Sequence, residues 1–387
     1  MKADKQIRNQ EILSNIRDIL EQRGITQRDL AMLVGKKEAE ISRWMSGKFN
    51  ISHQSQLKIE KALGQPISAD STFRGQSGEV RIGIIGTGNI AERFMHEVIH
   101  VKDVTVTAAY NPENSKTAAF CQKHGIANCC SSPQELLAHV DAVYVASPVD
   151  THCQYTGMAL ENGRHVLCEM PFTMHVKEAA DLLKAAAKKN LVLLTALKTA
   201  YCPSFEQMIM MTKTGIIGQV VDVTATVTNL LPEDSTPDFA NERMVENLSY
   251  PLLVFFKLLG FGYRSIHSFT RKTDDKMLFT NTTIEYKDAI ASLKVGIGVK
   301  SEGSLVVSGT QGYIYVPAPW WKPDYFEVRF ENPADNKKYF FPYEAAGLRY
   351  EIQALRDSIN HISTRKYISR EEILKIIELQ EKIFKTK

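Results

Sequence analysis

The sequence has no apolar run long enough to cross a membrane and no cysteine spacing typical of a metal site. Its most apolar helical stretch, residues 250–259, contains Lys257 and is far shorter than the about 20 residues that a spanning helix needs. The six cysteines follow neither a metal-ligand nor a disulfide pattern, which predicts free thiols and no bound metal. The first residues, MKADKQIRNQ, lack the apolar core of a secretory signal, so we expect a cytoplasmic protein.

The chain also lacks a strong excess of either charge, because its formal net charge is only +3. Residues 1–74 contain 13 Lys and Arg against 9 Asp and Glu, whereas residues 75–387 contain 34 against 35. The excess positive charge therefore lies in the N-terminal part. With 44% hydrophobic and 24% charged residues over 387 positions, the chain is expected to form two or three ordinary folded domains.

Residues 1–66 have the pattern of a small bundle of helices. Thr26 is placed to cap a second helix with Asp29 three residues later, and further helices are expected from near Lys37 and after Ser52. The stretch GITQRDLAMLVGKKEAEISRWMSGK closely resembles the helix-turn-helix of the lambda-repressor-like (XRE/Cro) family. A bundle kept for dimerisation or protein contact is the alternative, since this geometry is also used without DNA.

The resemblance implies that the third helix enters the major groove and that Gln27 meets a DNA phosphate. Lysine and arginine suit backbone phosphates, and a carboxylate accepts a hydrogen bond from cytosine N4. The chain departs from the family in having acids where small polar or amide side chains often read bases. The expected partner is a pseudo-palindromic DNA operator, and the candidate contact residues are Gln27, Lys36, Lys37, Glu38, Glu40, Ser42, Arg43 and Lys48.

Residues 67–78 are poor in large apolar side chains and are expected to form a linker. Beyond them strand-like and helical stretches alternate, which requires a parallel sheet covered on both faces. The first expected strand ends in the turn GTGNIA, whose glycine spacing leaves backbone N–H groups facing a phosphate. The strands are expected at 80–85, 104–109, 142–146, 166–168 and 191–194.

This turn predicts that the cofactor is NAD or NADP, and the sequence leaves open which of the two. The second strand ends in Ala109-Tyr110-Asn111, with neither the carboxylate usual for NAD nor an arginine. We expect Asn111 to hydrogen-bond a ribose and Tyr110 to pack on the adenine; a glycine turn without a ligand is the alternative. The candidate cofactor residues are Gly86, Thr87, Gly88, Asn89, Ile90, Tyr110, Asn111, Ser147, Pro148, His152, Glu169 and Met170.

Two later stretches, DAVYVASPVDTH and GRHVLCEMPFTMHVKEA, resemble the Gfo/Idh/MocA oxidoreductases, and the similarity extends over residues 79–387. The resemblance implies a Rossmann dinucleotide-binding domain at 79–200. It also implies an α+β domain at 201–387 with a large, mostly antiparallel sheet, one face of which commonly forms a dimer. The expected fold class is thus α/β and α+β multidomain, with an all-α helix-turn-helix bundle at 1–66.

The same resemblance implies where hydride-transfer chemistry would occur. The family has Glu-Lys-Pro where this chain has Glu169-Met170-Pro171, and methionine carries no charge and donates no proton. The family's Arg-aromatic-x-Pro stretch is replaced by AYCP at 200–203. Its Asp-x-Gly-x-His motif aligns with ENLSY, where Glu246 replaces the aspartate and Tyr250 the proton carrier.

Two functions are compatible with these features. The first is a DNA-binding transcriptional regulator whose catalytically degraded oxidoreductase domain senses a nicotinamide dinucleotide or a sugar-like metabolite. The alternative is an NAD(P)-dependent oxidoreductase on a polyol, sugar or nucleotide-sugar, with Tyr250, Lys198 and Glu246 as candidate catalytic residues. Lys198 is otherwise a solvated lysine or one that meets a cofactor phosphate. A homodimer or a higher homo-oligomer is expected in both cases.

Overall fold

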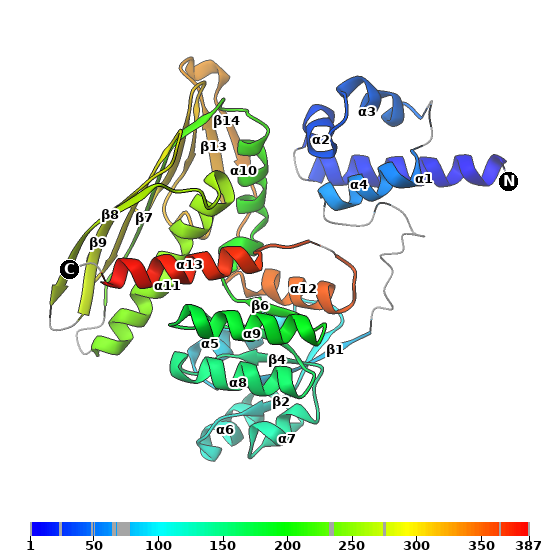
Figure 1. Cartoon of the computed structure of the whole chain (residues 1–387). Helices are drawn as coiled ribbons and strands as arrows, with labels where there is room; N and C mark the ends of the chain where they lie inside the picture. Colours follow the sequence, from blue (N-terminus) through cyan, green and yellow to red (C-terminus); the bar gives the residue numbers. More distant parts are fainter. Residues whose placement is uncertain are drawn as a thin grey trace. The chain divides into compact units, whose positions relative to one another are not determined.

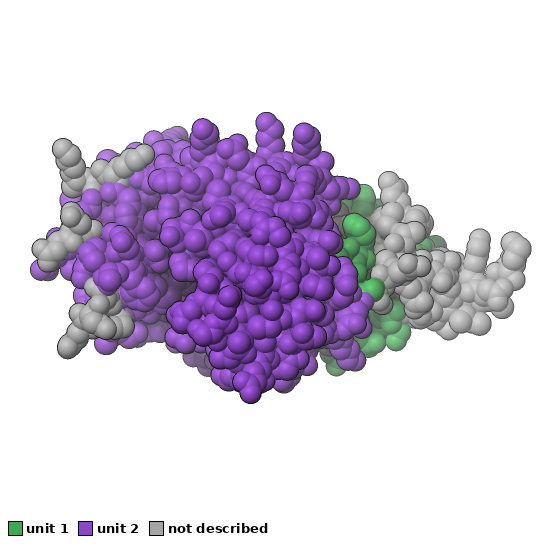
Figure 2. Space-filling model, turned by 90° about the horizontal axis from the view of Figure 1, so that it is seen from below, with its two compact units in different colours: residues 1–78, 356–366 green, residues 79–355, 367–387 purple. Residues whose placement is uncertain are grey.

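The computed structural model describes residues 2–22, 25–47, 49, 51–63, 67, 78–231, 236–273, 276–363 and 365–385. The chain divides into two compact units, residues 1–78 with 356–366 and residues 79–355 with 367–387 (Figure 2). The finer predicted boundaries at 66, 78 and 200 stay predictions. Within the described ranges, every helix is too short or too polar to cross a bilayer.

The first unit begins with a helical bundle, and its predicted helix cap is confirmed. Thr26 Oγ1 accepts the Asp29 N–H at 3.2 Å, and Asp29 Oδ2 accepts the Thr26 N–H at 2.9 Å. Gly35 ends the capped helix with a φ of 65°, a conformation that favours glycine. The helices are α1 (Lys2–Gln22), α2 (Gln27–Val34), α3 (Glu38–Met45) and α4 (His53–Leu63) (Figure 1).

The second unit starts with a parallel sheet in the order β3-β2-β1-β4-β5-β6, which confirms the predicted Rossmann architecture. Only β3 (Asn128–Cys130) was not expected, because three residues are too few to show an apolar alternation. Helices α8 (Val149–Glu161) and α9 (Val176–Lys188) pack together beside the sheet (Figure 1). The remaining strands are β1 (Val80–Ile85), β2 (Val104–Tyr110), β4 (Ala142–Val145), β5 (His165–Cys168) and β6 (Leu193–Thr195).

The second sheet has the order β14-β13-β12-β11-β7-β10-β9-β8. Neighbouring strands are antiparallel except for β7 and β10, which confirms the predicted large, mostly antiparallel sheet. Helix α11 (Pro237–Leu259) packs on this sheet, and α13 (Arg370–Lys385) packs on α11 (Figure 1). The strands are β7 (Val220–Asn229), β8 (Ser265–Thr273), β9 (Lys276–Glu285), β10 (Ile290–Ile297), β11 (Leu305–Gly309), β12 (Tyr313–Val316), β13 (Tyr325–Arg329) and β14 (Lys337–Phe340).

The two sheets of the second unit meet at the carboxyl end of the Rossmann strands. The short 3-10 helix η1 (Lys198–Tyr201) and α10 (Pro203–Lys213) follow β6 and lead toward the second sheet. Each sheet has its own apolar core, and Met170, just after β5, packs against both cores. The candidate site therefore lies where residues from both halves of this unit come together.

Candidate functional site

The turn between β1 and α5 (Asn89–Val98) is shaped for a close approach by a ligand. Gly86 has a φ of 99°, and a Cβ there would lie 2.4 Å from the Ala146 carbonyl oxygen, so no other residue fits. Gly88 is the N-cap of α5, has no side-chain cap, and leaves space where an added Cβ would meet no protein atom within 4 Å. A helix start of this kind fits the phosphates of a dinucleotide.

The predicted residues around this turn are held by their neighbours. Asn111 Nδ2 donates to Thr87 Oγ1 at 3.0 Å, which ties the glycine turn to the end of β2. Tyr110 is 9% exposed and meets the Tyr155 ring edge-on, with centroids 6.2 Å apart. Asn89 is exposed in the first turn of α5, and Ile90 beside it is half-buried. The contacts of Asn111 with a ribose and of Tyr110 with an adenine stay predictions.

His152 joins the two loops that follow β4 and β5. It is 2% exposed, its Nδ1 lies 2.8 Å from the Pro171 carbonyl oxygen, and its Nε2 lies 2.8 Å from the Ser147 carbonyl oxygen. A doubly protonated ring donates to both carbonyls, whereas a neutral ring donates to one. His152 therefore positions the loop with Ser147 and Pro148 against the loop with Glu169 and Met170.

Two interacting acids lie at this end of the unit, and the sequence revealed only one of them. Tyr144 donates its hydroxyl proton to Glu169 Oε1, and Glu169 Oε2 accepts the Met170 N–H at 3.2 Å. Glu351, on α12 (Leu348–Ile359), is 1% exposed, and its Oε2 has no hydrogen-bond partner in the described part of the chain. Burial, followed by the negative charge of Glu169, raises the pKa of Glu351 well above its ordinary value.

Tyr250 and Glu246, one turn apart on α11, are in direct contact. The Tyr250 hydroxyl donates to Glu246 Oε1 at 3.2 Å, and Arg243 donates to Glu246 Oε2 at 2.5 Å. Tyr250 is 3% exposed and its ring stacks on Trp321, with centroids 6.3 Å apart. Burial, followed by the charge of Glu246, raises the pKa of Tyr250 well above its ordinary value. A phenol held protonated in this way is a poor base at neutral pH.

Lys198 is half-buried in η1, and its positive charge counteracts the pKa increase of Glu169 and Glu351. Among the residues that can be described, no hydrogen bond joins it to Tyr250. A second lysine, Lys322, lies in the loop between β12 and β13 and was not predicted from the sequence. The aromatic-rich stretch PAPWWKPDYFE around it indicates a dimer interface or the lining of a ligand cleft, but a tertiary contact was needed to identify Lys322 itself.

In the first unit, the candidate DNA-contacting residues that the structure describes lie at the start of α2, just before α3 and on α3. Lys36 Nζ pairs with the Glu40 carboxylate at 2.8 Å and lies 5.8 Å from the centroid of the Trp44 ring. This pairing offsets the repulsion that Glu40 alone would exert on a phosphate. Lys36 and Glu40 are half-buried, and Lys48 lies outside the described residues. The exposed candidates are Gln27, Lys37, Glu38, Ser42 and Arg43.

Comparison with known families confirms both predicted resemblances. Residues 80–197 match the Gfo/Idh/MocA model, described as an oxidoreductase family with an NAD-binding Rossmann fold. Residues 16–69 match a helix-turn-helix model. The predicted cofactor class, NAD or NADP, agrees with the first match, and the helix-turn-helix match suggests DNA binding.

The relatives of the second unit include several dehydrogenases and reductases. A scyllo-inositol 2-dehydrogenase (NADP(+)) from Bacillus subtilis is 36% identical over 131 residues, which are 33% of this chain and 40% of that enzyme's length. A trans-1,2-dihydrobenzene-1,2-diol dehydrogenase from Xenopus laevis is 26% identical over 301 residues, 72% of this chain and 88% of the enzyme. The crystal structure of a 3-ketoreductase from Actinomadura kijaniata, in complex with NADP and TDP-benzene, matches with a TM-score of 0.69 at 20% identity. It covers 79% of this chain and 97% of its own, a likeness of fold alone.

Proposed function

We propose that this chain, which joins a helix-turn-helix domain to a Rossmann domain of the Gfo/Idh/MocA type, is a DNA-binding transcriptional regulator. Its second unit serves as the sensor of a nicotinamide dinucleotide, a sugar-like metabolite, or both. The observation that carries the proposal is the environment of Tyr250, whose hydroxyl is buried and donates to the Glu246 carboxylate.

Oxidation of an alcohol needs a group that takes the hydroxyl proton. The nicotinamide, when bound, exchanges the hydride, so the proton has to be handled by the chain itself. Glu246 stabilises the protonated form of Tyr250, and Met170 offers an apolar thioether at the position where the family has a lysine. These features support a site that binds its ligand without turning it over.

Exposed cations of the first unit support the proposed binding of DNA. Lys37 is exposed as the N-cap of α3, and Arg43 is exposed in its last turn, so both cations are available to phosphates. We propose residues 1–66 as the DNA-reading domain, 67–78 as its linker, and 79–200 and 201–387 as the two sensor domains. A homodimer would place two α3 helices about 34 Å apart on a pseudo-palindromic operator.

A mobility-shift assay tests this function with the full chain, DNA fragments from its own operon, and NAD, NADH, NADP or NADPH. We expect sequence-selective, salt-sensitive binding that changes with one of the dinucleotides. Lys37→Ala together with Arg43→Ala should weaken binding by about tenfold or more. Lys58→Ala on α4 removes a like charge away from α3 and should have a smaller effect. Absence of selective binding under every cofactor condition contradicts the proposal.

A second candidate function is an NAD(P)-dependent oxidoreductase acting on a polyol, sugar or nucleotide-sugar. The position of Lys198 favours it, because this cation acts on Glu169 beside Met170. The test is NAD(P)H formation from a panel of such alcohols. Turnover that falls by about 100-fold in Tyr250→Phe, and also falls in Lys198→Met, would favour the enzyme. No turnover with any of the alcohols supports the sensor.

A further inference from the structure

Two lysines that are far apart in the sequence are brought together by one hydrogen bond. Thr199 Oγ1 donates to the Trp321 carbonyl oxygen at 2.6 Å, across 122 residues of chain. Lys198 precedes Thr199 and Lys322 follows Trp321, so the backbones of the two lysines lie within about 12 Å. Both lysine side chains are half-buried, and the Trp321 ring stacks on Tyr250. The two lysines are close enough to Glu246, the partner of Tyr250, and to one another for their charges to interact.

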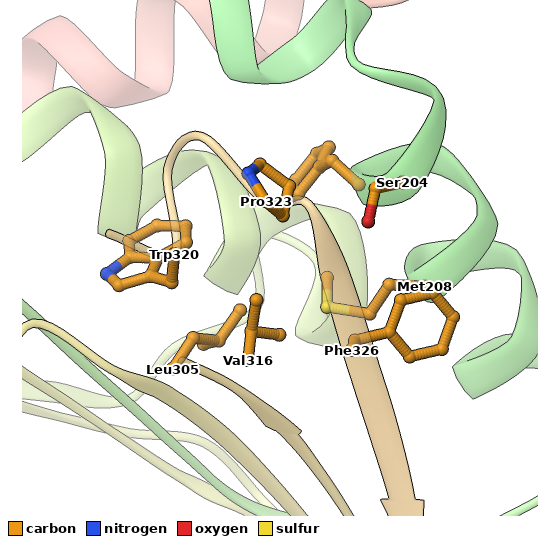
Figure 3. A pocket seen from close by; sticks show the side chains of 8 residues that line it. Ser204, Met208, Leu305, Val316, Trp320, Pro323 and Phe326 are labelled. Atoms are coloured by element: carbon orange, nitrogen blue, oxygen red, sulfur yellow. The ribbon is translucent and has the colours of Figure 1, made fainter. Parts of the chain in front are cut away.

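The loop that carries Lys322 is fixed on both sides. Trp320 is fully buried, and its Nε1 donates to the Thr226 carbonyl oxygen at 2.9 Å. Figure 3 shows Trp320 and Pro323 beside the same small apolar cavity. The Lys322 N–H donates to the Pro319 carbonyl oxygen at 2.8 Å, which closes the turn. The backbone of Lys322 is thus held in place before any ligand arrives, as is typical of a preorganised binding loop.

The cations around this loop form no close ion pair among the described residues, although the charge of Lys198 acts on Glu169 and Glu351 and that of Glu246 acts on Lys322. Neither Lys198, Lys322 nor Arg93 has an acidic partner within 4.0 Å among the residues that the structure describes, and Glu246 is already paired with Arg243. Burial, followed by the positive charges of Lys198 and Arg93, lowers the pKa of Lys322. A cluster of like charges is unfavourable in the free protein, and a bound anion would relieve the repulsion.

We propose that the metabolite bound beside Tyr250 is anionic, a sugar-like molecule whose phosphate or carboxylate is held by Lys198 and Lys322. This inference rests on the proposed sensor function and names its ligand class. The phosphates of the dinucleotide are accounted for by the turn at Gly86 and Gly88, whereas Lys322 belongs to a loop of the second sheet. The anion is therefore part of a second ligand.

Thermal unfolding of the full chain, saturated with NADP+ and kept at constant ionic strength, tests the inference with three probes. Glucose 6-phosphate and gluconate carry a phosphate and a carboxylate, and glucose is their neutral counterpart. We expect one of the two anions to stabilise the chain at a concentration at least about tenfold below that of glucose. Which anion is the stronger identifies the group. The response should be lost in the double variant Lys198→Gln, Lys322→Gln and kept in Lys287→Gln, which removes an exposed lysine.

Two outcomes overturn the inference: no preference for either anion over glucose, or an equal preference in the wild type and the double variant. Circular dichroism of the double variant verifies that it folds. Calorimetric titration with NADP+ in the same samples separates the two proposals. Retained dinucleotide binding without an anion preference contradicts this inference alone. If the wild type shows neither dinucleotide binding nor cofactor-dependent DNA binding, the sensor function itself fails.

Discussion

The starts of α2 and α5 meet the same requirement in opposite ways. Each helix begins with backbone N–H groups that have no partner inside the helix. In α2, Thr26 and Asp29 cap the first turn with their own side chains. In α5, the N-cap is Gly88, which provides no side chain and leaves the first turn to whatever binds there.

Selected charged residues of the two units also differ in whether they have a partner inside the chain. In the first unit, Lys36, which precedes α3, pairs with Glu40 on α3. In the second unit, Lys198 and Lys322 have no acidic partner within 4.0 Å among the described residues, and the buried Glu351 has one oxygen without a hydrogen bond there. The Lys36–Glu40 pair stabilises α3 without the help of a ligand. Groups left without partners mark the places where a ligand would complete the structure.

A side-chain cap on α5 would remove the difference between the two helix starts, and we expect the largest effect from it. In Gly88→Asp the carboxylate caps the free N–H groups and repels a phosphate. The dinucleotide affinity should fall by at least about 100-fold in a calorimetric titration, without loss of thermal stability. Gly88→Ala adds a Cβ that meets no protein atom within 4 Å and controls for volume. Unchanged affinity in Gly88→Asp would place the dinucleotide elsewhere.

The second prediction concerns the buried acid. Because the pKa of Glu351 is raised in the folded chain, the unfolded chain releases this proton first as the pH rises above the ordinary value of 4.5. The contribution of Glu351 to the free energy of unfolding is fully present below pH 4.5. It decreases as the pH rises toward the pKa of the folded state, by up to about 1.4 kcal/mol per pH unit. In Glu351→Gln the free energy of unfolding, measured with denaturant, should decrease less between about pH 5 and 8 than in the wild type. Parallel profiles for wild type and variant would contradict this; exposed Glu331→Gln is the control.

The third prediction concerns the ion pair between Glu40 on α3 and Lys36 just before that helix, which leaves Lys36 less available to DNA. Glu40→Gln removes a negative charge and frees Lys36, so DNA affinity should rise by about threefold to tenfold. The salt dependence should steepen by about one ion. Glu38→Gln removes the same charge from the same helix, and among the described residues Glu38 holds no lysine in an ion pair, so its smaller gain isolates the part due to Lys36. Equal gains in mobility-shift titrations would show that Lys36 contributes nothing.

The smallest effect is expected from removing one unpaired cation. Lys322→Gln relieves its repulsion with Lys198 and Arg93, so the ligand-free chain should unfold about 1 to 3 °C higher. Lys287→Gln should leave the unfolding temperature unchanged. A lower unfolding temperature in Lys322→Gln would mean that Lys322 stabilises the free protein. Repulsion from Lys198 and Arg93 would then not be the main effect of Lys322 in the free protein.

Features that depend on neighbours in the sequence could be predicted closely. The capping box at Thr26 and Asp29 needs only a spacing of three residues, and strand β1 has the predicted bounds, Val80–Ile85. Glu246 and Tyr250 were linked in advance by alignment of ENLSY with the family's Asp-x-Gly-x-His motif. Alignment with the family motif identified the exchange at Met170.

Features that depend on contacts between distant segments could not be predicted. Nothing near Lys322 in the sequence indicates that Thr199 reaches the carbonyl before it. Glu351 lies in a helix of ordinary amphipathic pattern, so its burial and its interaction with Glu169 depend on how that helix packs. The part of the site contributed by tertiary packing is thus the part that the sequence concealed.

The packing of Met170 against two apolar cores also bears on how the protein can evolve. A lysine restored at this position would have to bury its ammonium between those cores or withdraw and leave a gap, and either change destabilises the fold. A lysine at this position would therefore need compensating substitutions in both cores. A single exchange of Met170 for lysine is therefore expected to destabilise the chain rather than simply supply the missing charge.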